Sequence, residues 1–579
     1  MADPQNFSSY EGIASGTGIT HIEIPLVTST AYGQFVLDPP GSIWTVQWAL
    51  LVALSLLLLP KALSSIGLLI SKDAKDNCKR ATPVPYLIPI IGNLWMFLYD
   101  PQELIGLIAQ RFGKSGIFSL NLLTREVYIV AGAEYLNAIW KDTKKVMMSH
   151  DALNLSLSNM FALPKKDMPF FWSDRTGSSH DPHTQSPPRA ADQRVAYLML
   201  KTSAEYLSRG NLAATAERYQ IAMKNQLSDV PIQGEWVEMD DLFDFARRLV
   251  ANATCESILG STFLTQFPDF VDNFYVYNSR IRRLLQGWPR FLIPRAWQAR
   301  KRCIEIMGQW RKTLNVHDFD GSPMMLKRWS IFAKWNISDE AIASQDLGIL
   351  WGTYSNAVIL TFWLCWHALQ DRKLLAAATA EIDECWREEA DGNLVLDATK
   401  LTSQPLLQSM HAEALRKYVA VYIARTTEYG ETQVLDYRIP KNKFLVINSA
   451  IAHHDERNWN LGPKGEYPVD KFWGERFLTR SPGVSDGGSG MDDRAKPVYS
   501  MSQYKGAWVP FGGGIHQCPA RHWVKTKMLV SLAMITGTFE IELLNRKEDL
   551  KVDLAKYGLG ALNPGEKAPF RIRRKSAPV

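Results

Sequence analysis

The chain has 579 residues, of which 46% are hydrophobic and 21% are charged, and its net charge is +6. Its six cysteines are widely scattered and include no C-x-x-C pair, which disfavours both a zinc site and a disulfide framework. The positive net charge is compatible with an acidic protein partner or an anionic membrane surface. No aromatic or domain pattern supports nucleic-acid binding.

The first predicted element is a transmembrane anchor at residues 43–60. Ile43–Leu59 is uncharged over about 17 residues, near the lower limit for crossing a hydrocarbon core of roughly 30 Å. Lys and Arg are absent before this run and follow it at Lys61, Lys72, Lys75, Lys79 and Arg80. By the positive-inside rule, residues 1–42 are expected to be luminal and the bulk of the chain cytosolic. A buried core helix is the alternative interpretation of the run.

A basic juxtamembrane segment and a proline-rich hinge are predicted for residues 61–92. Pro83, Pro85 and Pro89 stiffen this stretch and prevent a helix, as expected of a linker between an anchor and a catalytic body. A plain surface loop is the alternative. No second linker divides residues 93–579, which are therefore expected to form one large domain.

This domain is predicted to be mainly α with small β-sheets. Apolar residues recur at helical spacing in Ala191–Leu207, Asn211–Leu227, Met239–Leu259, Gln298–Leu314 and Leu374–Glu388. Strand-like runs such as Tyr128–Val130 and Phe444–Ile447 are short. The polar stretches Asp174–Ala190 and Ser481–Lys496 are predicted to be surface insertions.

Leu347–Leu369 predicts one long apolar helix with two polar residues, Ser355 and Asn356, near its centre. The Asn356 amide can donate and accept hydrogen bonds, but it has no titratable proton for general acid catalysis.

An E-x-x-R pair, Glu413 and Arg416, follows this helix at a spacing that brings both side chains to one helix face. Chance supplies many such pairs, but here Arg425, His453-His454-Asp455 and Glu475-Arg476-Phe477 come after it in turn.

The most informative segment is Phe511–Ala520, with the sequence FGGGIHQCPA. Three glycines allow the backbone to approach a ligand closely, and helical spacing resumes after Cys518. Cys518 is therefore predicted at a loop-to-helix junction, where free N–H groups lower the pKa of a thiol and prepare it to bind a metal.

These segments, taken in order, resemble the cytochromes P450, the haem-thiolate monooxygenases. The resemblance extends from Pro83 to about Leu544 and implies the P450 fold, preceded here by a single transmembrane helix. It implies haem b as cofactor, with the Cys518 thiolate as iron ligand and Phe511 and Gly514 in the haem-binding loop.

The resemblance also assigns roles to the charged residues. Arg425 and His516 are expected to bind haem propionates, with His516 in a place where the family usually has Arg. Glu413, Arg416 and Arg476 are expected to form a structural triad, although Gly474 replaces the usual proline before Glu475. A buried triad of this kind must be fully paired, because removing one charge leaves the others uncompensated.

Most P450s carry an acid followed by Thr at the centre of the oxygen-activating helix, where this chain has Ser355 and Asn356. Together with Trp351-Gly352 and Phe362-Trp363, this resembles the branch that contains sterol 7α- and 12α-hydroxylases and prostacyclin synthase. The resemblance makes Ser355 and Asn356 the candidate catalytic residues, with a proton relay through Ser355, water or substrate. Alternatively, Asn356 only accommodates a kinked helix.

The resemblance implies a monooxygenase of the endoplasmic reticulum membrane that oxidises an apolar sterol, terpenoid or similar secondary metabolite. Electrons would come from NADPH–cytochrome P450 reductase, with cytochrome b5 as an optional second donor. Lys505, Arg521, Lys525 and Lys527 surround the cysteine loop and are a candidate docking face. Two alternatives remain: an isomerase or dehydratase that acts on a peroxide or epoxide without external electrons, and a haem-binding membrane protein without turnover.

Overall fold

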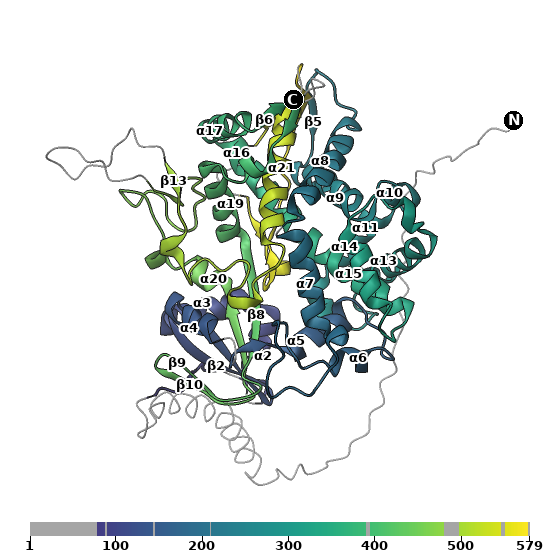
Figure 1. Ribbon diagram of the computed structural model, residues 1–579. Coiled ribbons are helices and arrows are strands. Elements are labelled where there is room, and N and C mark those ends of the chain that lie inside the picture. Colours follow the sequence, from purple (N-terminus) through teal and green to yellow (C-terminus); the bar gives the residue numbers. More distant parts are fainter. Residues whose placement is uncertain are drawn as a thin grey trace, which may run out of the picture. The chain divides into compact units, whose positions relative to one another are not determined.

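The computed structural model describes residues 78–576, except residues 87, 89, 143–144, 209, 390–393, 480–496 and 546–549 (Figure 1). The predicted luminal segment 1–42, the predicted anchor 43–60, the juxtamembrane residues 61–77 and the predicted insertion Ser481–Lys496 lie outside the described residues.

The largest sheet combines strands from distant parts of the chain. Its order is β1 (Thr82–Pro83), β2 (Gly116–Leu122), β3 (Arg125–Ala131), β11 (Phe444–Asn448), β8 (Val419–Thr426) and β16 (Leu559–Ala561), and β4 (Met147–Met148) also pairs with β8. Neighbouring residues Ile117 and Phe118 on β2 enter two different hydrophobic clusters, so both faces of the sheet are covered. Helices α2 (Leu94–Tyr99), α3 (Pro101–Phe112), α4 (Ala133–Lys141) and α20 (Ser449–His453) are drawn near this sheet in Figure 1.

The remaining helices form the bulk of the domain. They are α5 (His150–Leu155), α6 (Met168–Trp172), α7 (Val195–Leu207), α8 (Leu212–Ser228), α9 (Leu242–Leu259), α10 (Phe263–Gln266), α11 (Phe270–Asn278), α12 (Ile281–Leu285), α13 (Pro294–Thr313), α14 (Pro323–Phe332), α15 (Asp339–Tyr354), α16 (Ala357–Gln370), α17 (Arg372–Asp383), α18 (Ala398–Leu401), α19 (Pro405–Tyr418) and α21 (Arg521–Thr538).

Smaller sheets complete the domain. They are β14 (Phe539–Leu543) with β18 (Phe570–Arg574) and β5 (Val237–Met239), β6 (Trp386–Glu388) with β7 (Leu394–Leu396), β9 (Thr432–Val434) with β10 (Tyr437–Ile439), β12 (Leu478–Thr479) with β13 (Val498–Tyr499), and β15 (Val552–Asp553) with β17 (Asn563–Pro564).

The predicted class, mainly α with small sheets, is confirmed, and the predicted helices are found with shifted ends. Met239 belongs to strand β5 and not to the helix that follows it. The segment predicted as a helix to Glu388 ends at Asp383, because Trp386–Glu388 pairs with β7 instead. Strand pairing overrode the local helical pattern in both places, with the distant strand β18 at Met239 and with the neighbouring strand β7 at Trp386–Glu388.

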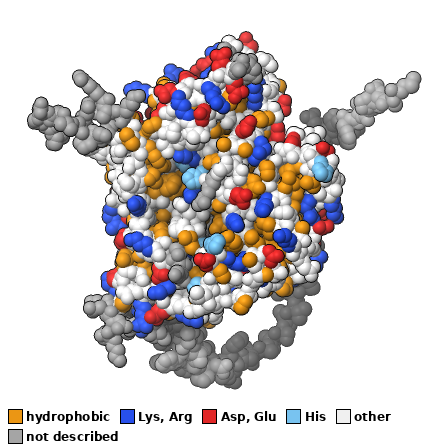
Figure 2. All heavy atoms as spheres, in the orientation of Figure 1, with side chains coloured by type: hydrophobic (Ala, Val, Ile, Leu, Met, Phe, Trp, Pro, Cys, Tyr) orange, Lys and Arg blue, Asp and Glu red, His pale blue; other side chains and the backbone are white. Residues whose placement is uncertain are grey.

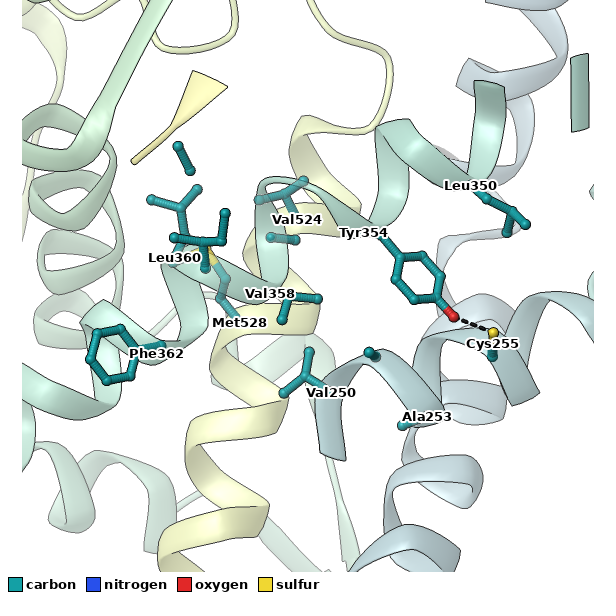
Figure 3. Close-up of a cluster of buried hydrophobic side chains, with 14 of the residues drawn as sticks. Val250, Ala253, Cys255, Leu350, Tyr354, Val358, Leu360, Phe362, Val524 and Met528 are labelled. Carbon is teal, nitrogen blue, oxygen red and sulfur yellow. Dashed lines mark hydrogen bonds between the residues drawn. The ribbon is translucent and has the colours of Figure 1, made fainter. Parts of the chain in front are cut away.

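The central core forms where α9, α15, α16 and α21 meet. Figure 3 shows Val250 of α9, Tyr354 of α15, Val358 of α16 and Met528 of α21 in one cluster. Within the described residues, Asp339–Gln370 is the one helical stretch whose length and composition would suit a membrane span, and most of it is buried inside the protein.

The long central helix is broken where one continuous helix was predicted. The Ser355 N–H bonds the Trp351 carbonyl, and the next bond across the break joins the Leu360 N–H to the Asn356 carbonyl. The segment therefore becomes α15 and α16, separated by Ser355 and Asn356.

The predicted surface insertion Asp174–Ala190 is partly wrong, because its first residues are buried. Asp174, Thr176 and Ser178 are all buried. Arg194 donates to the Thr176 hydroxyl at 3.1 Å and to the Ser179 carbonyl at 2.6 Å. These hydrogen bonds fix the start of the stretch against the protein, although its composition is that of a loop.

Figure 2 shows one face of the domain, on which basic and acidic side chains are interspersed with hydrophobic ones. A mixed surface of this kind differs from the continuous basic stripe that is typical of nucleic-acid interfaces.

Candidate functional site

Cys518 lies in a tight loop directly before α21, as the sequence predicted. Its N–H donates to the Phe511 carbonyl at 2.9 Å, which closes the loop. The Arg521 side chain donates to the Cys518 carbonyl at 3.2 Å, and α21 begins at Arg521. The Phe511 ring meets the edge of Trp508 with ring centroids 5.7 Å apart. The loop is therefore held at both ends.

Different structural constraints favour glycine at the three glycine positions of this loop. Gly512 and Gly514 adopt φ angles of 72° and 64°, in the left-handed region that side chains disfavour. Gly513 is extended, but a β-carbon there would lie 2.5 Å from the Trp140 ring. The loop backbone thus packs against an indole that no sequence motif had indicated.

Burial raises the pKa of the Cys518 thiol, while the Ala520 amide and the Arg521 charge act in the lowering direction. The net direction is opposite to the one expected from the helix terminus alone. Desolvation dominates because a thiolate in a poorly hydrated site loses water without gaining a full counter-charge. A metal cation would supply that counter-charge.

Three buried donors near this loop have no acceptor among the described residues. They are Nη2 of Arg425, Nε2 of His516 and Nε1 of Trp140. The Arg425 guanidinium lies over the Trp140 ring at 5.2 Å. Burial lowers the pKa of His516 to about 4, and the Arg425 charge acts in the same direction. Burial lowers the pKa of Arg425 to about 10, because no carboxylate compensates it.

His516 is oriented by the stretch that had been predicted as a surface insertion. Its Nδ1 lies 2.6 Å from the Ser178 hydroxyl. If the hydroxyl donates to Nδ1, the neutral ring carries its proton on Nε2, which is the atom without a partner. The site thus presents N–H donors from β8, α4 and the cysteine loop, a donor set that fits the carboxylates of haem.

Glu413, Arg416 and Arg476 are brought together and are fully buried. Arg416 Nε donates to Glu413 Oε2 at 2.7 Å, and Arg476 Nε donates to Glu413 Oε1 at 3.0 Å. Arg416 Nη2 also donates to Glu413 Oε1 at 2.9 Å, and further guanidinium N–H groups donate to backbone carbonyls, including those of His453 at 2.9 Å and Tyr467 at 2.9 Å. Every charge of the triad is therefore paired and hydrogen-bonded, which is what burial requires.

Gly474, found where the family usually has proline, packs against a crowded neighbour. A β-carbon at this position would lie 2.7 Å from Leu374 Cδ1 and 3.3 Å from Met410 Cγ. Helices α17 and α19 therefore approach the backbone just before Arg476.

Ser355 and Asn356 lie at the break between α15 and α16 but differ in exposure. Ser355 is buried, and its hydroxyl has no partner within the described part of the chain. Asn356 is half-buried, and its Oδ1 accepts a hydrogen bond from the Ala561 N–H at 2.9 Å. Gly352, four residues earlier, is exposed, and a β-carbon there would meet nothing within 4 Å. Gly352 therefore lies on an open side of α15, whereas Asn356 is held against Ala561.

A cavity of about 290 Å³ lies between the cysteine loop and α15. Its walls include His516 and Pro519 from the loop and Gly348 and Ile349 from α15. Most of the other lining residues come from segments before α8 and are apolar, among them Leu157, Phe161, Val195 and Met199, while the buried Arg328 of α14 adds a charged group. The space next to Cys518 therefore suits an apolar ligand.

The sequence interpretation of Lys527 as part of a surface docking face is wrong, because this residue is fully buried. A local signal existed, since Lys527 follows buried Trp523 by four residues on the same helix face. Trp140, Ser178 and Lys556 were also missed, and their sequence surroundings contain no signal that distinguishes them.

The family model described as Cytochrome P450 matches residues 82–569 of the chain. The chain is 29% identical to the cytochrome P450 monooxygenase efuG of Hormonema carpetanum, covering 86% of this chain and 90% of that protein. It is 28% identical to the cytochrome P450 monooxygenase fsoE of Humicola fuscoatra, covering 86% and 88%.

More distant similarity links the chain to a sterol enzyme and to a solved structure. It is 24% identical to the cholesterol 7-alpha-monooxygenase of Cricetulus griseus, covering 59% of this chain and 67% of that enzyme. The structure of retinoic acid bound cyanobacterial CYP120A1 superposes with a TM-score of 0.59 at 17% identity, covering 86% of this chain and 99% of the other. At this identity the superposition supports the fold alone.

Proposed function

The chain belongs to the cytochrome P450 family, and we propose that it is a membrane-anchored enzyme that oxidises an apolar sterol, terpenoid or similar secondary metabolite. It is a cytochrome P450 monooxygenase whose cofactor is haem held by a cysteine thiolate. This confirms the family, the activity class and the cofactor expected from the sequence. The predicted likeness to the branch with sterol 7α-hydroxylases is also confirmed.

When bound, the haem supplies the oxygen activation, and its thiolate ligand favours O–O bond cleavage. The residues assigned to this group are Cys518 as the ligand, and Arg425, His516 and Trp140 as donors to its carboxylates. The triad of Glu413, Arg416 and Arg476 holds the backbone behind the loop and takes no chemical part.

The observation that carries the substrate proposal is the apolar cavity beside the cysteine loop. Phe161, Val195 and Ile349 line it, so a hydrocarbon skeleton that binds there would leave water and contact apolar side chains. This transfer is favourable. The apolar lining supports a lipophilic substrate, the class that the family resemblance implied.

One wall of this cavity also carries an amide donor. Gln345 is buried, its Nε2 has no acceptor within the described residues, and its side chain contributes to the lining. An unsatisfied buried donor is costly, so a ligand acceptor at this point would be favoured. This supports a substrate that combines an apolar skeleton with one oxygen function, such as a hydroxyl or carbonyl group.

Membrane attachment is supported by one exposed patch. Ile90 is 80% exposed and Phe291 is 78% exposed, and both lie among further exposed apolar residues, namely Ile88, Ile91, Trp95, Tyr99 and Leu292. The two segments are adjacent, since Gln286 donates to the Leu98 carbonyl at 3.1 Å and the rings of Tyr99 and Trp288 lie 6.5 Å apart. Exposed apolar side chains with nearby arginines favour a lipid surface.

The isomerase or dehydratase is the second candidate function, and Asn356 is what favours it. Neither Asn356 nor Ser355 supplies the carboxylic acid that oxygen activation commonly uses. Rearrangement of a peroxide or epoxide would not need that acid, whereas the named relatives are monooxygenases.

The deciding experiment incubates membranes that contain the full chain and NADPH–cytochrome P450 reductase with apolar metabolites, with and without NADPH. A product heavier by one oxygen atom that forms only with NADPH supports the proposal. A product of unchanged mass that forms without NADPH supports the isomerase. Alkaline carbonate extraction of the same membranes, compared with a chain lacking residues 43–60, tests the anchor.

A further inference from the structure

Two buried lysines converge on the break between α15 and α16. Lys527, on α21, donates to the Thr353 carbonyl at 3.1 Å. Lys556, at the end of the turn Leu554–Lys556, donates to the Ser355 carbonyl at 2.9 Å. The residues are 0% and 1% exposed, so neither can act at the surface.

Burying a lysine away from water is unfavourable, and neither Lys527 nor Lys556 forms a salt bridge within the described residues. Burial lowers the pKa of each lysine to about 7, while Cys255 raises that of Lys527 and Asp553 raises that of Lys556. Burying two amino groups at one backbone segment therefore costs folding free energy. The segment that they contact is the bend between α15 and α16.

The break explains why N–H donors are useful there. The bonds that remain join the Ser355 N–H to the Trp351 carbonyl and the Leu360 N–H to the Asn356 carbonyl, which leaves the carbonyls between them without their usual helical partners. The amino groups reach two of these carbonyls. A positive charge at the C-terminal end of α15 also interacts favourably with the helix dipole.

The same turn region fixes the side chain of Asn356. Ala561, five residues after Lys556, donates its N–H to Asn356 Oδ1. Gly560 permits this approach, because a β-carbon there would lie 2.2 Å from that oxygen. The bend is therefore held by α21 through Lys527 and by residues 556–561 through both Lys556 and Ala561.

We propose that Lys527 and Lys556 are positioning residues that hold the bend of the oxygen-activating helix and thereby fix the position of Asn356 at that bend. The inference deepens the proposed function and rests on it. Neither lysine touches the cavity described above, so both act through Thr353, Ser355 and the neighbouring Asn356.

The test compares Lys527→Met and Lys556→Met in the full chain, because methionine keeps much of the volume and removes the N–H donors. Lys301→Met is the matched control, since the Lys301 side chain is 79% exposed on α13. Three quantities are measured: haem content, the affinity of the ferric protein for imidazole, and hydrogen peroxide released per NADPH consumed with reductase present.

Both buried-lysine variants are expected to bind haem, to change imidazole affinity by about threefold or more, and to release about threefold more peroxide per NADPH. The control is expected to match the wild type. In an Asn356→Ala background, the lysine substitutions are expected to change neither the imidazole affinity nor the peroxide release further, because the side chain that they position is absent.

Lysine variants that contain haem and match the wild type in imidazole affinity and in peroxide release would overturn the proposal. Lysine substitutions that have the same effects in the Asn356→Ala background as in the wild type would overturn it too. Leucine replaces any methionine variant that fails to incorporate haem, and failure of both would make that lysine a folding residue and reject the positioning role. Imidazole binding needs neither reductase nor substrate. A wild type that binds imidazole but shows no NADPH-dependent reaction would therefore count against the monooxygenase and not against the positioning role.

Discussion

Asn356 and Ala561 are joined by a hydrogen bond of 2.9 Å between the Asn356 side-chain oxygen and the Ala561 amide. The bond assigns the two ends of the carboxamide, because an oxygen must face the donor N–H. The amide nitrogen is thus left to donate to another acceptor. A residue that the sequence indicated as a candidate catalytic group is fixed in orientation by a strand 205 positions later.

Replacing Asn356 separates its structural bond from its chemistry. Asn356→Ala removes the acceptor for the Ala561 N–H and is expected to cost about 1 kcal/mol of stability and to raise peroxide release per NADPH. Asn356→Asp keeps an acceptor oxygen and adds a titratable proton, so it should retain more stability and change the pH dependence of turnover. Urea denaturation and pH–rate profiles check both. Equal pH profiles in Asn356→Asp and the wild type would show that no proton passes this position.

The Glu413→Gln substitution tests the triad. It removes the one negative charge between two buried guanidinium groups, Arg416 and Arg476, and should destabilise the fold by about 3–5 kcal/mol with poor haem incorporation. The measurement is urea denaturation together with the carbon monoxide difference spectrum of the reduced protein. Glu305→Gln is the control, because its exposed pair with Lys301 should contribute less than about 0.5 kcal/mol. Similar losses in both variants would contradict the assignment.

The Arg425→Met substitution should leave the thermal stability of the haem-free protein intact but speed the loss of haem from the haem-bound protein. Without haem, the buried guanidinium has no carboxylate partner, so its removal should not lower the thermal midpoint. With haem, a charge-assisted bond to a carboxylate is lost, and haem transfer to apomyoglobin should become about tenfold faster. Arg295→Met, at an exposed residue of α13, is the control. A lower midpoint in the haem-free variant would show that Arg425 is paired within the protein.

The Cys518 loop and the Glu413 pair were predictable because each is specified by a short run of residues. The glycines, the cysteine and the following helix lie within one segment, and Glu413 and Arg416 are one helical turn apart. Their contacts follow from local geometry, with only Arg476 added from a later segment. The positions of the predicted anchor and the candidate docking face depend on surroundings that the sequence does not specify.

The residues that the sequence did not indicate are defined by contacts between distant segments. Ser178 meets His516 from 338 positions away, and Lys556 meets Ser355 from 201 positions away. Their types, a serine in a polar stretch and a lysine in a turn, are ordinary at a surface. Only the tertiary structure shows that they are buried. A kink at Asn356 was one interpretation of the sequence, but the groups that stabilise the break come from elsewhere in the chain and could not be predicted.

The unpaired amide N–H of Gln345 should make the protein bind a substrate with an acceptor oxygen more tightly than the same skeleton without it. Gln345→Leu removes a donor that has no acceptor in the described protein, so stability should be unchanged or slightly higher. Binding of a substrate with an acceptor oxygen at this point should weaken about tenfold, while its deoxygenated analogue should bind as before. Substrate-induced spectral titration of the haem measures both affinities. Equal losses for the two compounds would place the oxygen function elsewhere in the cavity.

The buried lysines predict an unusual dependence of stability on pH. Lys527 and Lys556 have an ordinary pKa of 10.5, which burial lowers to about 7 in the fold. Between these values the unfolded chain binds more protons than the folded one, so each lysine makes unfolding more costly as the pH rises. The penalty is fully present below about pH 7 and disappears above the unfolded pKa, and each pKa unit is worth about 1.4 kcal/mol.

The methionine variants isolate this contribution, because groups common to both proteins cancel in the comparison. Cys255, beside Lys527, has its pKa raised to about 12 by burial and stays neutral through most of the window. Lys556→Met and Lys527→Met should therefore be most stable relative to the wild type near pH 7, and this advantage should shrink steadily toward pH 10. Thermal midpoints at a fixed scan rate across the range measure the difference. A difference that does not change with pH would mean that the two lysines keep their ordinary pKa in the fold, and so that water reaches the bend.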